Sequence, residues 1–221
     1  MSNASFMSRY GDRLAANGYS ILPLQPGAKK PGRFVRGEWR DYPDWTRHAE
    51  RATTDVEIAL WEKWPDAGVG VVGGNVAAVD IDIKDEPELA RRIEELARER
   101  LGDTPAVRIG KAPKRMLIYR TTAPFKGVKR HPLEILCLGQ QFVAYAQHPE
   151  TGRPYEWPEE SLADIDIEKL PAIDEAAPRA FLEEASALLP ESVKPVRLAS
   201  SNGVVRPSRT QAGTLPAIRA A

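Results

Sequence analysis

Two aspartates, Asp80 and Asp82, stand inside an apolar run, VGVVGGNVAAVDIDI, at residues 69–83. In a β-strand, the aliphatic residues that alternate with them would lie on one face and both carboxylates on the other. At about 3.3 Å rise per residue, the carboxylates would be roughly 6.6 Å apart at the backbone and could converge on one cation. Like charges so close repel each other, and a divalent metal ion commonly offsets that repulsion. The spacing indicates either a Mg²⁺ or Mn²⁺ site, or two carboxylates that are simply solvated or cap the next helix.

A third carboxylate, Glu134 in HPLEILCLG, begins another predicted strand. If that strand lies beside the aspartate strand, three carboxylates surround one site, as two-metal phosphoryl or nucleotidyl transfer requires. If it does not, Glu134 is an exposed acid at a strand end. The D-x-D pattern alone leaves the reaction open, because sugar-nucleotide transferases, nucleases and polymerases all use it.

Basic side chains supply the natural counterpart to these acids. Arg108, Lys111, Lys114 and Arg115 occupy a Gly/Pro turn between two apolar strands, where they could hold a nucleotide triphosphate. The segment is not a Walker A loop, since G-x-x-x-x-G-K-[ST] occurs nowhere in the chain. His148 follows a strand and is a further candidate for nucleotide binding or general base catalysis, while the three histidines lack the spacing of a zinc site.

A second basic segment, QPGAKKPGRFVRGEWRDYPDW, is predicted to be a loop in which aromatic and basic residues alternate. Lys29 and Lys30 are candidates for binding phosphates of a template or nucleotide. Trp39 or Tyr42 is a candidate for stacking on a base. Exposed basic loops are also common without any such role.

Helical periodicity predicts four helices. One has Phe6, Tyr10 and Leu14 on one side, and the second opens with a capping box at Thr54–Glu57. The third runs over residues 85–101 with Asp85 as N-cap, and the last covers residues 179–189. In the second helix, Val56, Leu60 and Trp64 are expected on the buried side, with Pro65 ending the helix.

Strands are predicted around Ile21–Leu24, before and within the aspartate run, on both sides of the basic turn, and as a β-hairpin about Gly139. This mixed order favours an α+β fold over a doubly wound parallel sheet. Residues 1–189 are expected to form one domain, and residues 190–221 a flexible basic tail or linker.

Composition describes an ordinary protein with a core: 221 residues, 42% hydrophobic, 28% charged and zero formal net charge. The single cysteine, Cys137, excludes a disulfide framework and is expected in a buried strand. No signal-peptide core or run of about 18 apolar residues appears, so a cytoplasmic location without a membrane partner is expected.

Taken together, these segments resemble the primase–polymerase (Prim-Pol) domain of the archaeo-eukaryotic primase superfamily, found in phage, plasmid and bacterial replication proteins. The resemblance spans roughly residues 10–160 and lies in the order of several segments. These are LAANGYSILPLQPGAKKP, a tryptophan-bearing loop, AGVGVVGGNVAAVDIDI, a glycine- and basic-rich turn, LEILCLGQQFVAYAQHP and TGRPYEW.

The resemblance implies a template-dependent DNA primase/polymerase. Asp80, Asp82 and Glu134 would hold two Mg²⁺ or Mn²⁺ ions, dNTPs or NTPs would be the substrates, and single-stranded DNA the template. It also implies an RRM-like catalytic half beside an N-terminal α/β half, with a replicative helicase as a partner domain or protein. The family's second motif usually carries a histidine. The matching segment GKAPKRMLIYR has none, so Lys114 or Arg115 would take over its phosphate contact.

Two other hypotheses follow from the same residues. A chain that keeps the fold but has lost its chemistry would be a nucleic-acid-binding replication module. A different D-x-D enzyme, such as a nuclease or sugar-nucleotide transferase, would use the same carboxylates without a template.

Overall fold

Two antiparallel sheets organise the chain in the computed structural model, which describes residues 4–190. The helices are α1 (Phe6–Ala16), α2 (Asp55–Trp61), α3 (Pro87–Leu101) and α4 (Ala176–Leu188), with 3-10 turns η1 (Trp45–Ala49) and η2 (Ile167–Lys169). The first strands are β1 (Ile21–Leu24), β2 (Gly32–Val35), β3 (Glu38–Asp41), β4 (Gly68–Val72) and β5 (Val76–Ile81). The others are β6 (Val107–Arg108), β7 (Arg115–Thr121), β8 (Val128–Arg130), β9 (Leu133–Leu136), β10 (Gln141–Tyr145) and β11 (Ala172–Ile173). The predicted α+β class is confirmed.

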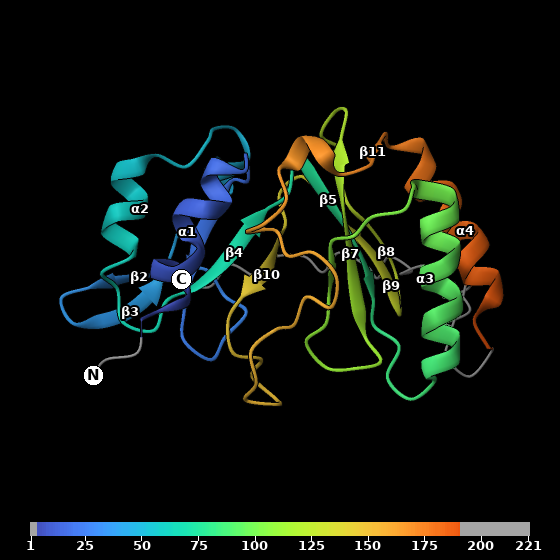
Figure 1. The fold of residues 1–221 in the computed structure, drawn as a ribbon, viewed down its shortest axis with the longest axis horizontal. Helices are drawn as coiled ribbons and strands as arrows, with labels where there is room; N and C mark the ends of the chain where they lie inside the picture. The colour runs from blue at the N-terminus through green and yellow to red at the C-terminus, as the bar shows by residue number, and fades with distance from the viewer. Residues whose placement is uncertain (1–3, 191–221) are drawn as a thin grey trace, which may run out of the picture.

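The smaller sheet has the order β1-β4-β10 and packs against α1 (Figure 1). Its apolar residues share one core with α1, α2 and one face of the larger sheet, as Val69 and Phe142 cluster with Ala78 and Ile118. The two sheets are therefore joined by a common core.

The larger sheet has the order β11-β7-β5-β9-β8, with β6 also pairing with β7. Among the strands of this sheet within residues 4–190, β11 alone runs parallel to its neighbour. Helices α3 and α4 lie side by side over its other face, where Ile93 and Phe181 join a second core with Val79 and Ile135 (Figure 1). The face of β5 that carries Asp80 consequently points away from α3 and α4.

Two short crossings between the sheets lie at residues 73–75 and 137–140, and a longer one leads from β10 back to β11. The predicted β-hairpin about Gly139 is therefore wrong: β9 pairs with β5 and β8, whereas β10 pairs with β4. Gly139 does turn the chain, at φ +77°. The two crossings touch, because the Gly73 N–H donates to the Gln140 carbonyl at 2.9 Å.

The second helix is rotated relative to the prediction. Its capping box is present, but Val56 is 80% exposed and Leu60 52% exposed, while Ile58 and Trp61 are buried. Helix α2 also ends at Trp61, before Pro65. The reason is tertiary: the Trp61 ring packs edge-on against His48 and Tyr42, which sequence periodicity cannot include.

Three smaller expectations also change. The predicted loop at residues 25–45 contains the β2–β3 hairpin, which turns through Arg36 and Gly37, both at positive φ. Helix α3 takes Glu86 rather than Asp85 as its N-cap, and α4 begins at Ala176. The predicted tail lies outside the described residues, except for residue 190.

None of the helices within residues 4–190 is long and apolar enough to cross a bilayer.

The crossing at Gly73 generates a stability prediction. A Cβ on Gly73 would lie 2.2 Å from the Cys137 carbonyl oxygen, so Gly73→Ala should lower the free energy of unfolding by about 3 kcal/mol. Gly139→Ala is the control, because a Cβ there meets nothing within 4 Å and only its positive φ costs stability, about 1 kcal/mol. Urea unfolding followed by circular dichroism measures both, and equal losses would contradict the proposed contact between crossings.

Candidate active site

Asp80 and Glu134 lie directly opposite each other in the larger sheet. The antiparallel register of β5 and β9 pairs Asp80 with Glu134, between the pairs Val79–Ile135 and Ile81–Leu133. Directly opposed residues share a face, with Cβ atoms about 5 Å apart. The prediction that the Glu134 strand neighbours the aspartate strand is therefore confirmed.

Asp82 lies just beyond the end of β5. Its N–H donates to the Pro132 carbonyl at 2.9 Å, which continues the association with the β9 side of the sheet. The predicted alternation is confirmed, since Val79, Ile81 and Ile83 are buried against α3. The Asp82 carboxylate binds the Lys114 ammonium, Oδ1 to Nζ, at 2.5 Å.

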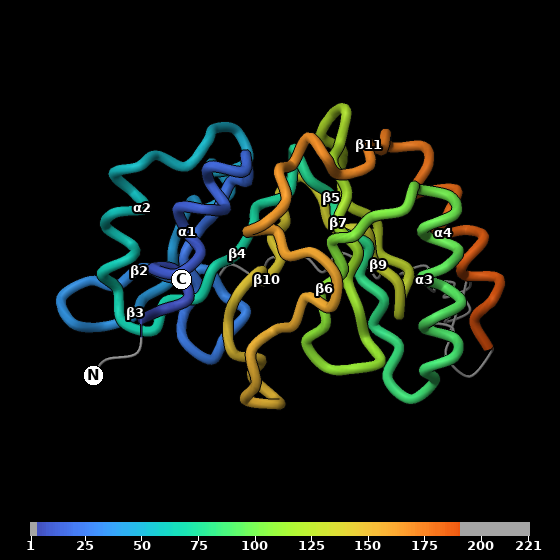
Figure 2. Tube along the Cα trace, in the orientation of Figure 1, coloured from blue at the N-terminus to red at the C-terminus, as the bar shows by residue number. Residues whose placement is uncertain are grey.

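A small cavity of about 60 Å³, here called the acid pocket, opens at the two aspartates. It gathers residues from the loops after β1, β5, β6 and β10, which meet at the lower edge of the molecule in Figures 1 and 2. Its lining consists of Lys29, Asp80, Asp82, Arg108, Gly110, Lys111, Lys114, Arg115, His148 and Tyr155. Most of the residues predicted separately for acid and phosphate chemistry thus come together, while Glu134 pairs with Asp80 beside the pocket.

Arg108 is the buried cation of the acid pocket. It is 9% exposed, donates from Nη1 to the Val143 carbonyl, and lies with Cζ 4.5 Å from the centre of the Tyr155 ring. Its Nε–H has no hydrogen-bond partner among the described residues. Burial lowers the pKa of Arg108, and Tyr155 and Asp80 oppose that shift. We conclude that Arg108, in the lining of the pocket, offsets the charge of Asp80.

The charged form of Asp80 is disfavoured mainly by burial and also by the two neighbouring carboxylates. Burial raises the pKa of Asp80, Asp82 and Glu134 raise it further, and Arg108 and Lys29 act in the opposite direction. Oxygen donors with excess negative charge suit Mg²⁺ or Mn²⁺, so this donor set fits the metal that the resemblance implies.

The carboxylates are held by protein partners rather than gathered around one point. Glu134 accepts from Lys129 Nζ and from Gln140 Nε2, both at 3.0 Å, and Asp82 is paired with Lys114. Correspondingly, no three His, Cys, Asp or Glu side chains within residues 4–190 are close enough to hold a metal ion together. Binding a metal here requires these carboxylates to exchange partners.

His148 lies in the acid pocket, buried at 3% exposure. Its Nδ1 accepts from the Glu150 N–H at 3.2 Å, and burial, with Lys29 nearby, lowers its pKa. The ring is therefore neutral at pH 7 and carries its proton on Nε2. A Cβ on Gly110 would lie 2.8 Å from the ring, so glycine is needed for this approach.

The other predicted phosphate ligands differ in placement. Lys111 is on the pocket rim and pairs with Glu150 at 2.7 Å. Arg115 binds Glu94 of α3 and the Pro113 carbonyl. The guanidinium of Arg115 is thus directed to α3, although the residue contributes to the pocket lining, so its phosphate role has the least support of the set.

The basic segment around Lys29 does not act as one unit. Lys29 reaches the acid pocket, where burial and Arg108 lower its pKa. Lys30 instead pairs with Asp41 of β3 at 2.5 Å. Trp39 packs edge-on against Trp64, with ring centres 5.7 Å apart, and the Tyr42 hydroxyl lies 2.9 Å from His48 Nε2. The rings proposed for base stacking are therefore engaged within the protein.

Sequence reasoning missed several residues of the site. Tyr155 and Gly110 line it, Gln140 holds Glu134, and Met116 flanks Asp80 on β7. The motif TGRPYEW contained Tyr155, but only the fold brings it against Arg108. Met116 lies on β7, within GKAPKRMLIYR, the segment that has no histidine.

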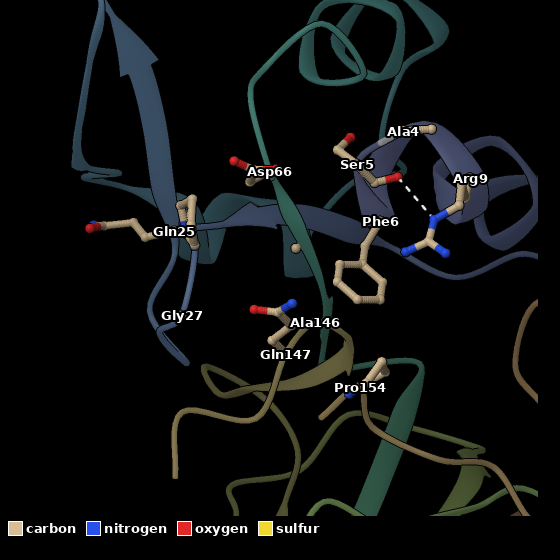
Figure 3. Close-up of a pocket in the computed structure, with 12 residues that line it drawn as sticks. Ala4, Ser5, Phe6, Arg9, Gln25, Gly27, Asp66, Ala146, Gln147 and Pro154 are labelled. Carbon is tan, nitrogen blue, oxygen red and sulfur yellow. Dashed lines mark hydrogen bonds between the residues drawn. The ribbon is translucent and has the colours of Figure 1, made fainter. Parts of the chain in front are cut away.

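A larger cavity, of about 460 Å³, is lined by residues of α1 and of the loop after β1, among others (Figure 3). Three segments contribute both to it and to the acid pocket: Gly27, Gln147 and Pro154 line this cavity, and Lys29, His148 and Tyr155 the acid pocket. Phe6 and Arg9 of α1 close its other side, as Figure 3 shows. It contains one arginine and one aspartate, and lacks the excess of cations found in the acid pocket.

The raised pKa of Asp80 predicts a stabilising substitution. Folding favours protonated Asp80, so this stability is present at low pH and is lost as the pH rises through the folded-state pKa, above the usual 3.8. Asp80→Asn should therefore raise the free energy of unfolding at pH 7 in metal-free buffer by about 1 kcal/mol, with no gain below pH 3.8. Thermal unfolding across pH measures this, with Asp12→Asn on the exposed side of α1 as the matched control. Destabilisation by Asp80→Asn at pH 7 would contradict the charge strain.

One family model matches most of the chain. The family model described as bifunctional DNA primase/polymerase, N-terminal (Prim-Pol), matches residues 12–173, which include every residue of the acid pocket. Among curated proteins, none matches the chain. The Prim-Pol family is a family of nucleotidyltransferases. The chain belongs to the Prim-Pol family.

Proposed function

We propose that the chain is a template-dependent DNA primase/polymerase that makes or extends primers on single-stranded DNA by two-metal nucleotidyl transfer. The observation that carries this proposal is the pairing of Asp80 with Glu134, with Asp82 adjacent, at the mouth of a pocket lined with cations. Membership of the Prim-Pol family supports the reaction class.

The three carboxylates would hold the metal ions. When bound, Mg²⁺ or Mn²⁺ would lower the pKa of an attacking 3′-hydroxyl and neutralise charge on the leaving pyrophosphate. Asp80 is fixed by its place within β5, whereas Asp82 beyond the strand end can adjust. Glu134 is fixed in the same way within β9, so the predicted division is two ligands held in paired strands and one adaptable ligand, Asp82.

The triphosphate of a dNTP or NTP would lie along the cationic side of the acid pocket. Lys29, Lys111 and Lys114 would offset its charge, and His148 would donate from Nε2 to a phosphate oxygen. Arg108 would hold Asp80 in place rather than contact the nucleotide, because its guanidinium is stacked on Tyr155 and bonded to the Val143 carbonyl.

The template and context remain proposals from the resemblance. Single-stranded DNA would approach the acid pocket, with Lys30 as a weaker candidate for backbone contact, since Asp41 occupies it. Trp39 would have to leave Trp64 to stack on a base. A role in phage, plasmid or bacterial replication, beside a helicase, fits the family.

A second candidate function is a nucleic-acid-binding replication module without catalysis. Two observations favour it. The segment GKAPKRMLIYR, whose Met116 flanks Asp80, lacks the histidine usual in the family's second motif. The carboxylates are also paired with Lys114, Lys129 and Gln140 rather than gathered for a metal. The retained face-to-face acids argue against it, because directly opposed like charges destabilise a sheet that has no use for them. A nuclease or sugar-nucleotide transferase would act without a template, which the following experiment tests.

Primer synthesis and extension on single-stranded DNA, with Mg²⁺ or Mn²⁺ and labelled dNTPs or NTPs, tests the proposed function. Asp80→Asn should lower the rate at least about a hundredfold, because it removes a charge aimed at the reacting centre. The Asp12→Asn variant should match wild type. Pyrophosphate release without template would support another D-x-D enzyme, and DNA binding without synthesis by wild type would support the module.

Lys29 provides a test of how the basic segment is divided. Because Lys29 lies in the acid pocket and Lys30 pairs with Asp41, Lys29→Gln should raise the KM for the nucleotide about tenfold. The same change at Lys30 should alter that KM less than about twofold. Steady-state extension of a preformed primer measures both constants. Equal effects at the two lysines would show that the segment acts through general charge.

A further inference from the structure

The ion pair between Lys114 and Asp82 joins the two ligand sites proposed above. Both residues line the acid pocket, and their charged atoms are 2.5 Å apart. Asp82 is a proposed metal ligand and Lys114 a proposed triphosphate ligand. While the two are paired, Lys114 lies where a metal ion would bind Asp82, and Asp82 lies where the triphosphate would bind Lys114. Neither can serve its proposed role fully while the pair is intact.

The pair has the freedom to open. The Lys114 side chain is 24% exposed and that of Asp82 38% exposed, and both lie outside the regular strands. Lysine carries its charge on a flexible four-carbon stem, which can swing between partners. Arg115, one residue along, is instead held by Glu94 and the Pro113 carbonyl, so the neighbouring cation cannot replace Lys114 on Asp82 without breaking those bonds.

The lysine that pairs with Glu134 is placed differently from Lys114. Lys129 pairs with Glu134 at 3.0 Å, but it is 66% exposed and is not part of the acid-pocket lining. An exposed pair of this kind contributes little and yields easily to a metal ion. Of the two lysines paired with Asp82 and Glu134, Lys114 is therefore the one that can respond to a ligand inside the pocket.

We infer that Lys114 couples metal binding to nucleotide binding by exchanging the Asp82 carboxylate for the triphosphate. Without nucleotide, Lys114 occupies Asp82 and weakens metal binding. An incoming triphosphate draws Lys114 away and leaves Asp82 available as a metal ligand. Because coupling between two sites is reciprocal, metal on Asp82 also releases Lys114 for the nucleotide. This inference rests on the proposed function, since it requires both ligands to bind in this pocket.

The test is Mn²⁺ binding without nucleotide, followed by electron paramagnetic resonance of the free ion, on the whole chain. Lys114→Gln should bind Mn²⁺ about threefold to tenfold more tightly than wild type, because Asp82 loses its internal partner. The matched control is Lys111→Gln, which removes the same charge from the same turn but from a pair with Glu150. It should change Mn²⁺ affinity less than about twofold.

A second measurement separates exchange from a general structural effect. With saturating Mn²⁺, the affinity for a non-hydrolysable dNTP should fall several-fold in Lys114→Gln, and Lys114→Arg should recover most of it because the positive charge is retained. Tighter Mn²⁺ binding together with weaker dNTP binding would indicate exchange, whereas a disturbed fold would weaken the binding of both.

The outcomes distinguish the inference from the function on which it rests. Mn²⁺ binding that Asp82→Asn weakens but Lys114→Gln leaves unchanged would overturn the coupling and leave the metal site standing. An equal gain in Lys111→Gln would overturn it too, because general charge would then explain the effect. Absence of Mn²⁺ binding in wild type, with and without nucleotide, would overturn both the proposed metal site and the coupling.

Discussion

The antiparallel pairing of β5 with β9 is the constraint on which the rest of the site depends, because it places the carboxylates of Asp80 and Glu134 opposite each other. Like charges at directly opposed positions destabilise a sheet, and partial burial increases that cost. The surrounding cations are the response: Arg108 lies buried near Asp80, and lysines pair with Asp82 and Glu134. A sheet with carboxylates at these positions is stabilised by positive charge nearby.

The arrangement of the two sheets determines which cationic side chains lie close enough to offset the charge of these carboxylates. The larger sheet presents the carboxylates on the face that α3 and α4 leave uncovered, and the smaller sheet shares a core with that face. The chain crosses between the sheets at Gly73 and near Gly139, which brings the loops after β1 and β10 to the edge of β5. Lys29 and His148 thus meet Asp80 although they belong to the other half of the molecule.

Much of this could be read from local sequence, and the failures have a common cause. Alternation predicted that Asp80 and Asp82 lie on the face opposite Val79 and Ile81. That Glu134 lies beside them was a hypothesis about sheet order, which the register of β5 and β9 bears out. Periodicity failed where contacts with residues distant in sequence determine the structure. The contact of Trp61 with Tyr42 determines which face of α2 is buried. Gly139 separates strands of different sheets rather than joining a hairpin. Spacing also could not show that Arg115 binds Glu94, or that Tyr155 stacks on Arg108.

The proposed function requires that Asp80, Asp82 and Glu134 together hold the metal ions for nucleotidyl transfer. Anomalous X-ray diffraction at the manganese edge, from crystals grown with Mn²⁺ and a non-hydrolysable dNTP, would locate these ions. We expect Mn²⁺ within coordination distance of Asp80 and at least one of the other two carboxylates, beside the triphosphate. Nucleotide bound in the acid pocket with Mn²⁺ elsewhere, and with Asp82 and Glu134 still paired with Lys114 and Lys129, would contradict the proposed metal site.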